Sequence, residues 1–371
     1  MNRRDDTADI KQGLKDRIVD LCGRLLPDGQ MQGRLWVAHN PVTCDHHKSA
    51  EFKVALTRDI GAWKDYRTGE KGDVVRLIEY CRQCSFREAM DFARDFLGIR
   101  QMTREDFARF QQRSAEARAK AEQEAEKKRL QNIAFAEKLF HKGYLDGAGS
   151  TAEAHARAYF AARRIPLDQI PKRDTATMRF APALEYWRRA KFERRDGKLI
   201  KISEGPSFPV ILSAMRAPTG QIAACHCTFL SPLGPKKLPV GEDENAKLMR
   251  GEAKGAMIRI SHGPEGVPPE LAQQAWPLLL GEGIETTASV SIEAPEARAW
   301  AAGSLSNMGN APIDLPCISA VIVLKDHFKS KTTEKQFADV LEKLAAHGKP
   351  VTVIESIAGN DFNDQLQEGD E

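Results

Sequence analysis

The spacing of apolar and polar residues predicts a first region in which helices and short strands are mixed. In residues 10–26 apolar side chains recur every three or four positions, which predicts one helix that stops at the Pro-Asp-Gly turn behind it. Residues 51–56 alternate apolar and polar side chains, which predicts a strand with one buried face. Ser85 and Glu88 have the spacing of a capping box, so another helix is expected to begin there.

A long polar segment follows. Residues 103–140 are rich in Ala, Glu, Lys, Arg and Gln and contain neither Gly nor Pro, so they predict one long and mostly solvated helix. Positive and negative side chains are evenly interleaved along it. This mixture favours a spacer between two domains over the alternative, a helix that binds nucleic acid.

The last region alternates strands and helices. Strands are predicted at residues 277–280, 297–301, 320–324 and 351–354, and helices at 286–293 and 333–347. Strands that alternate with helices predict a parallel sheet covered on both faces. The region before it, up to about residue 269, is rich in Pro and Gly and contains several strand-like runs.

These patterns predict a multidomain α/β protein with four segments. The first domain is expected at residues 1–100, a helical linker at 101–148, a mixed α+β subdomain at 149–269 and the parallel-sheet domain at 270–371. A chain of 371 residues is long enough for two or three domains, each with its own core.

Composition excludes several classes of protein. The 55 Lys and Arg nearly balance the 52 Asp and Glu, so any affinity for nucleic acid must come from local basic patches. The seven cysteines are odd in number and scattered, which argues against a secreted disulfide scaffold. The chain opens with charged residues and has no apolar run of membrane-spanning length, so we expect a cytoplasmic protein without a membrane partner.

The candidate chemistry lies at the ends of the predicted strands of the last region. Glu282 directly follows one apolar strand and Asp326 follows another, while Asp361 and Asp364 lie in an acidic turn behind the final strand. Sites of parallel α/β sheets form outside the carboxyl ends of the strands. Carboxylates that converge there can bind a hard divalent cation, which takes oxygen ligands and organises phosphate groups.

Three motifs in this region resemble the Toprim domain of primases, topoisomerases and some nucleases. They are Gly281–Thr286, Trp300–Met308 and Asp361–Asp364, and the version they resemble most occurs in primase-like proteins of phages, plasmids and integrated elements. The resemblance implies a Toprim fold in which Glu282 and Asp326 bind Mg²⁺ or Mn²⁺. It also implies that Glu285, Asp361 and Asp364 belong to the catalytic site.

The second Toprim motif departs from the family pattern. Two aspartates one residue apart are expected there, but this chain has Asp326-His327-Phe328, so Phe328 replaces the second carboxylate. Lys325 stands where the family usually has a small residue, and its ammonium would compete with a bound cation. His327 is a possible substitute ligand, although a hard cation prefers oxygen.

The region before the Toprim motifs resembles the subdomain that precedes Toprim in primases. The run Ser207–Val210, a turn at Gly220 and the stretch Lys236–Gly241 carry this resemblance. In primases a basic surface of this subdomain holds template and incoming nucleotides, and such phosphate contacts are independent of sequence. The candidate residues here are His226, Thr228, Lys236, Lys237, Lys247, Arg250 and Arg259.

The first domain resembles a degenerate form of the zinc-ribbon domain that opens bacterial primases. Asp65 and Thr68 stand where that family has two cysteine ligands. A replacement site of sulfur and nitrogen ligands is conceivable, and its candidates are Cys44, His46, His47, Cys81 and Cys84. Because the last two flank a helix end away from the expected position, structural cysteines without zinc are the favoured interpretation.

Three functions remain open at this point. The first is primer synthesis on a single-stranded DNA template, by transfer of nucleotides at a Mg²⁺ or Mn²⁺ site. The second is a catalytically degenerate protein that binds nucleic acid or a replication partner, and Phe328 is the best argument for it. The third is a Toprim nuclease. The sequence has no P-loop, so a helicase would be a separate chain.

Overall fold

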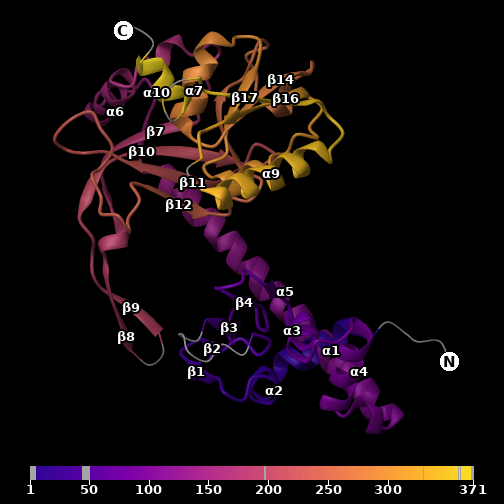
Figure 1. The fold of residues 1–371 in the computed structure, drawn as a ribbon. Helices are drawn as coiled ribbons and strands as arrows, with labels where there is room; N and C mark the ends of the chain where they lie inside the picture. Colours follow the sequence, from indigo (N-terminus) through magenta and orange to yellow (C-terminus); the bar gives the residue numbers. More distant parts are fainter. Residues whose placement is uncertain are drawn as a thin grey trace. The chain divides into compact units, whose positions relative to one another are not determined.

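The chain forms two compact units in the computed structural model, one of residues 1–126 and one of residues 127–371 (Figure 1). The structure describes residues 6–43, 51–195, 198–328, 330–357, 359 and 361–368. Each unit has its own apolar core, and the two are described separately below.

The first unit is a small antiparallel sheet with helices on one face. Its strands pair in sequence order, and they are β1 (Gln30–Gln32), β2 (Leu35–Ala38), β3 (Phe52–Ala55), β4 (Trp63–Asp65) and β5 (Lys71–Gly72). Its helices are α1 (Thr7–Asp16), α2 (Ile18–Leu25), α3 (Val74–Arg82) and α4 (Phe86–Phe96), followed by the short η1 (Ile99–Gln101). Ser85 and Glu88 form the predicted capping box of α4.

The predicted helix over residues 10–26 is two helices, because the chain breaks at Arg17. This residue has φ −115° and ψ 31°, outside the helical region. Its guanidinium donates a hydrogen bond to the carbonyl of Phe96 and lies 4.6 Å from the centre of the Phe96 ring. A contact with a residue so distant in sequence is not visible in the local pattern, which is why the pattern predicted a single helix.

Hydrogen bonds join the two positions at which the zinc-ribbon resemblance expects cysteines. The hydroxyl of Thr68 donates to Asp65 at 2.9 Å, and the amide of Asn40 donates to Asp65 and to the Tyr80 hydroxyl at 2.5 and 2.8 Å. These bonds tie the turn after β4 to the segment that follows β2 and, through Tyr80, to α3. Cys44, His46 and His47 lie outside the described residues, and burial raises the pKa of Cys81 to about 12. The absence of zinc stays a prediction.

The predicted long helix is α5 (Arg104–Phe140). Near its start Phe110 packs against the core of the first unit, and near its end Ala136, Leu139 and Phe140 are buried in the core of the second. Most side chains between these ends are exposed, as the mixture of charges predicts.

One mixed sheet runs through the second unit. The strand order is β12-β11-β10-β13-β15-β14-β16-β17, with β7 on β10 and β6 on β7. The antiparallel strands are β6 (Tyr144–Leu145), β7 (Met178–Glu185), β10 (Ser207–Arg216), β11 (Ile222–Phe229), β12 (Lys247–Gly251) and β13 (Met257–Ser261). The parallel strands are β14 (Trp276–Gly281), β15 (Arg298–Ala301), β16 (Ile318–Lys325) and β17 (Val351–Glu355). β8 (Lys191–Arg195) and β9 (Lys198–Ser203) form a separate two-stranded sheet.

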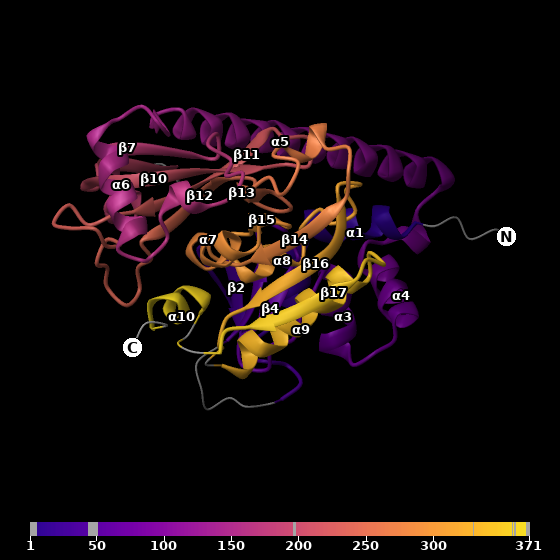
Figure 2. The same cartoon turned by 90° about the horizontal axis from the view of Figure 1, so that it is seen from above.

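The fold class predicted from the sequence is confirmed, including the parallel strands at the carboxyl end of the chain, which run side by side in Figure 2. The prediction did not include the continuity of the sheet. Ile258 of β13 pairs with Ala301 of β15, so hydrogen bonds cross the boundary expected at residues 269 and 270. The four predicted segments therefore stay an interpretation of the sequence.

Helices cover both faces of the parallel strands. On one face α7 (Ile284–Glu293) buries Ile284 and Ala288 against Leu279 and Ala299. On the other face α8 (Leu305–Met308) and α9 (Lys331–Ala345) pack with Leu278, Trp300 and Val321. The remaining helical elements are α6 (Thr151–Ala161), α10 (Phe362–Glu368), η2 (Leu167–Gln169), η3 (Trp187–Arg189) and η4 (Pro269–Leu271). None of the described helices combines the length and apolar character needed to cross a bilayer.

Candidate active site

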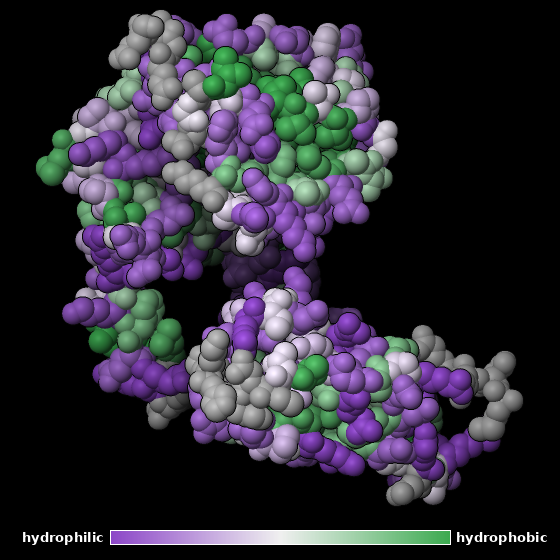
Figure 3. All heavy atoms as spheres, viewed as in Figure 1, coloured by the Kyte–Doolittle hydropathy of each residue, from purple (hydrophilic) through white to green (hydrophobic). Residues whose placement is uncertain are grey.

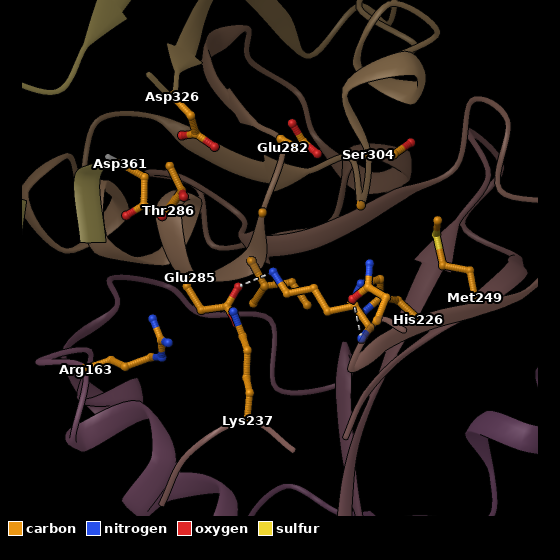
Figure 4. Close-up of a pocket in the computed structure, with 15 residues that line it drawn as sticks. Arg163, His226, Lys237, Met249, Glu282, Glu285, Thr286, Ser304, Asp326 and Asp361 are labelled. Carbon is orange, nitrogen blue, oxygen red and sulfur yellow. Dashed lines mark hydrogen bonds and ion pairs between the residues drawn. The ribbon is translucent and has the colours of Figure 1, made fainter. Parts of the chain in front are cut away.

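Four of the predicted carboxylates, Glu285 among them, line one cavity of about 320 Å³, and the other three share one wall of it (Figure 4). Glu282 follows β14, Asp326 follows β16, and Asp361 precedes α10, so all three lie at the carboxyl end of the parallel strands. Gly281 makes the tight turn into α7 possible, because any side chain there would collide with the Thr287 hydroxyl. The sheet topology therefore brings together carboxylates that are up to 79 residues apart in sequence.

Burial and neighbouring carboxylates act on Asp326 more strongly than the opposing charge of Lys247. Burial, followed by the nearby charges of Asp361 and Glu282, raises the pKa of Asp326 to about 7. Its Oδ1 atom is buried without a hydrogen-bond partner. Burial also raises the pKa of Glu282 above its usual value.

These features fit a divalent cation, which would neutralise the carboxylates and give the orphaned oxygen a partner. The described residues contain no group of three His, Cys, Asp or Glu side chains close enough to hold a metal ion. Glu282 and Asp326 would therefore supply only part of a coordination shell. Phosphate and water oxygens would have to complete it, which is the usual arrangement for Mg²⁺ in proteins.

The raised pKa leads to a prediction about stability. The folded chain holds the proton of Asp326 more tightly than the unfolded chain, so its contribution to the free energy of unfolding falls as the pH rises from about 4 to about 7. In EDTA at pH 8, Asp326→Asn should therefore stabilise the chain by roughly 1 kcal/mol. At pH 4 the gain should vanish. Urea unfolding at both pH values measures this gain in the free energy of unfolding. An equal gain at both pH values would contradict the raised pKa of Asp326.

Cations form the opposite wall of the cavity. Lys237 and Lys247 reach into it, and both ammonium groups contact the carboxylate of Glu285 at 3.0 Å (Figure 4). Arg163, which follows α6, lies on the same side, and Asn363 of α10 holds its guanidinium by accepting a hydrogen bond at 2.8 Å. Positive groups that face a carboxylate cluster across a cavity of this size are suited to a phosphate chain bridged to a cation.

The carboxylate of Glu285 is occupied by contacts with protein groups and is not free to bind a cation. Its Oε1 atom accepts a hydrogen bond from the Tyr159 hydroxyl at 2.7 Å in addition to its two lysine contacts, and the residue is 5% exposed. Although burial acts to raise the pKa of Glu285, Lys247 and Lys237 hold it well below its usual value. The carboxylate therefore positions the two ammonium groups at the cavity, a role that its place in the motif did not reveal.

Neutral groups close one end of the cavity. His226 is buried on β11, and burial together with the charge of Lys247 lowers its pKa to about 4, so the ring is neutral at physiological pH. Its Nδ1 atom lies 3.4 Å from the hydroxyl of Thr228, which is also buried. Met249 and Ser304 lie on the same part of the wall (Figure 4).

The predicted basic set does not form one surface. His226, Lys237 and Lys247 line the cavity, and Lys236 is exposed next to them in sequence. Arg250 is exposed on β12 and takes part in a different cavity.

Arg259 lies apart from all of these residues. It is 3% exposed, and its guanidinium is paired with Glu270 at 2.5 Å and bound to the carbonyl of Ala217. It therefore supports the packing of β13 and has no exposed charge to offer to a ligand. Charge alone marked Arg259 as a candidate, whereas its burial depends on the tertiary structure.

The structure also explains the unusual second motif. The ammonium of Lys325 contacts Glu355, its cross-strand partner on β17, at 2.8 Å, so it does not compete for the carboxylate site. His327 Nε2 lies 2.8 Å from the carbonyl of Ser356 and does not line the cavity, which argues against the idea that it replaces a metal ligand. Phe328 packs against the Phe337 ring of α9, with ring centres 5.3 Å apart.

This packing changes the expected effect of restoring an aspartate at position 328. Phe328→Asp should destabilise the chain by roughly 2 kcal/mol, because it removes an aromatic contact with the α9 core and buries part of a charge. Phe328→Leu should lose less than half as much. Thermal unfolding of the two variants measures the difference. Equal stability of Phe328→Asp and the parent chain would show that the ring does not hold α9.

Sequence reasoning missed Arg163 and the part played by Asn363. Asn363 is fully buried in the third motif, where it holds Arg163 and the Ser289 hydroxyl. The third motif contained the only sequence signal for this role, because the amide of Asn363, which lies between Asp361 and Asp364, is a strong hydrogen-bonding group. Asp364 does not line the cavity, although its charge contributes to the raised pKa of Asp326.

Comparison with known proteins identifies two segments. Residues 277–371 match the family model described as Toprim domain. Residues 136–260 match a family model described as a domain of unknown function, DUF7146. No curated protein sequence matches the chain.

Solved structures of primases are among those to which the chain is similar. The zinc-binding and RNA polymerase domains of the Aquifex aeolicus primase are 12% identical, with 97% of this chain and 82% of that chain covered and a TM-score of 0.39. The E. coli primase catalytic core is 14% identical, with 64% and 75% covered and a TM-score of 0.42. The primase fragment of the bacteriophage T7 primase-helicase protein is 14% identical, with 49% and 64% covered and a TM-score of 0.29. At such low identity these likenesses do not decide the function.

Proposed function

We propose that this chain, whose residues 277–371 form a Toprim domain, is a primase-like protein that transfers nucleotides to a growing primer. The observation that carries the proposal is the cavity in which Glu282, Asp326 and Asp361 face Lys237, Lys247 and Arg163. A nucleoside triphosphate needs both walls, because its phosphates carry several negative charges and bind a divalent cation.

Each group has a defined role in this proposal. Glu282 and Asp326 would hold Mg²⁺ or Mn²⁺, which when bound neutralises charge on the reacting phosphate. Lys237 and Lys247, held by Glu285, bind the phosphate oxygens of the incoming nucleotide. Arg163 offers a planar guanidinium suited to bidentate contacts with phosphate. The substrates are a single-stranded DNA template and nucleotides, and a helicase on a separate chain is the proposed partner.

A primer synthesis assay tests this function. Purified full-length chain is incubated with a single-stranded template and labelled nucleotides in Mg²⁺ or Mn²⁺, and the products are separated by size. We expect short oligonucleotides that require template and cation. Failure to make them with either cation on mixed templates would contradict the proposal, and nicking of a plasmid in the same buffer would indicate a Toprim nuclease.

A specific observation favours a second candidate function, a protein that binds nucleic acid without catalysis. Phe328 occupies the position of the second motif's aspartate and is packed against Phe337, so one expected carboxylate is absent. Under this alternative the chain would bind a template but incorporate no nucleotide, and Glu282→Gln would leave its biological function intact. Measuring both binding and synthesis on the same preparation separates the two candidates.

A further inference from the structure

A basic and apolar ribbon projects from the second unit. We call strands β8 and β9 (residues 191–195 and 198–203) the β8–β9 arm, and among the described residues these two strands pair only with each other (Figure 1). Apolar and hydrophilic side chains lie next to each other on its surface (Figure 3). Its exposed apolar residues are Phe192, Leu199, Ile200 and Ile202, between 43% and 64% exposed. An isolated two-stranded ribbon is only marginally stable in water, so a ligand that covers these side chains would stabilise it.

The charge of the arm indicates what kind of ligand would cover it. The eleven residues of its two strands contain five Lys and Arg against one Glu. Arg195 is already paired with Glu193 at 2.8 Å. The remaining positive charge favours an anionic ligand, and the apolar side chains favour one that also presents flat or apolar groups.

A second cavity, of about 420 Å³, lies at the base of this arm. Its wall contains three aromatic rings, Phe135 of α5, Trp187 of η3 and Phe192 of β8, and the cations Lys142, Lys201 and Arg250. We call it the aromatic cavity. Phe135 is 56% exposed and Phe192 is 48% exposed, so these rings are accessible.

The three cations of the aromatic cavity differ in the partners that they contact. Lys201 contacts Glu185 at 2.5 Å, so this pair is largely neutral. Arg250 lies 4.4 Å from the centre of the Trp187 ring, an arrangement in which guanidinium and indole form one extended surface. Lys142 is exposed and makes no ion pair with the described residues. The site therefore offers flat surfaces and two cations to a ligand.

We propose that the aromatic cavity and the β8–β9 arm bind a segment of single-stranded nucleic acid, at a place distinct from the Glu282 cavity. Exposed rings on which bases stack, with cations beside them for the phosphates, are the two features that sequence-independent single-strand binding requires. This proposal rests on the proposed function and extends it, because a template strand would gain a second place of contact with the chain. An acidic peptide would use the cations but not the accessible rings.

Binding to a fluorescein-labelled single-stranded DNA of mixed sequence tests the proposal on the full-length chain. The double variant Phe135→Ala, Phe192→Ala should weaken binding by roughly tenfold or more, the effect of losing base stacking. Lys142→Glu should lower the slope of affinity against salt concentration by about one. Phe86→Ala and Lys335→Glu, which change an exposed ring and an exposed cation elsewhere, should leave binding unchanged.

Photo-crosslinking to iodinated DNA locates the contact. We expect adducts on Trp187 or Phe192. Adducts confined to the Glu282 cavity, or unchanged affinity in a double variant that unfolds at the parent temperature, would overturn the proposal. The proposal would also be overturned if the chain did not bind the DNA but bound a protein ligand through Phe192.

The two proposals can fail independently in these experiments. If the chain makes no primers but binds DNA through Phe135 and Phe192, only the proposed enzymatic function fails. If it makes primers and the double variant binds DNA normally, only the aromatic cavity is misassigned. Circular dichroism of each variant confirms that the fold is retained.

Discussion

Replacing Glu282 with glutamine should reduce cation-dependent primer synthesis by roughly 10²- to 10³-fold, the scale of losing one group that stabilises charge in a transition state. Glu282 lies at the end of β14, on the wall that it shares with Asp326 and Asp361. An amide keeps the size of the side chain but removes the charge that would hold Mg²⁺ or Mn²⁺. The rate of nucleotide incorporation on a single-stranded template measures the effect.

A matched control is available on the following helix. Glu293 is exposed at the end of α7, so Glu293→Gln should leave the rate unchanged. Glu282→Gln should also retain the thermal stability of the parent chain and its binding to single-stranded DNA. Normal synthesis by Glu282→Gln would exclude this carboxylate from the catalytic site and leave the non-catalytic function as the better explanation.

Replacing Glu285 with alanine should instead destabilise the whole second unit, by roughly 3 kcal/mol, because it leaves two partly buried ammonium groups without their partner. Glu285 is 5% exposed, and it contacts Lys237, Lys247 and the Tyr159 hydroxyl. Its pKa is held below the usual value, so its contribution is present above about pH 4.5 and is lost as the pH falls further. Urea unfolding at neutral pH measures the loss.

A compensated variant separates stability from function at this position. In the triple variant Glu285→Leu, Lys237→Met, Lys247→Met the buried charges are replaced by apolar side chains, which often restores stability. We expect it to unfold near the parent chain but to bind nucleotides weakly, because the ammonium groups are gone. Parental nucleotide affinity in the triple variant would show that these lysines do not contact the phosphates.

The sequence by itself determined the elements that carry the site. Apolar runs followed by an acidic residue predicted that Glu282 and Asp326 stand at strand ends, and the alternation of strands with helices predicted that the strands are parallel. Both features follow from local patterns, because a buried strand needs a continuous apolar run and its carboxyl end opens into a loop. The long α5 helix was equally visible, since thirty-eight residues without Gly or Pro have few other structures open to them.

Only the tertiary structure decided which charges face the cavity. The charges of Glu285 and Arg259 made both residues candidates for binding. In the structure Glu285 is paired with two lysines and Arg259 is paired with Glu270. Phe328 interrupts a motif, and only the packing of α9 shows what its ring contacts. Each of these outcomes depends on a partner at least nine residues away. Periodicity and motif spacing report on neighbours along one strand or helix, whereas burial and pairing are set by segments that meet only when the sheet has formed.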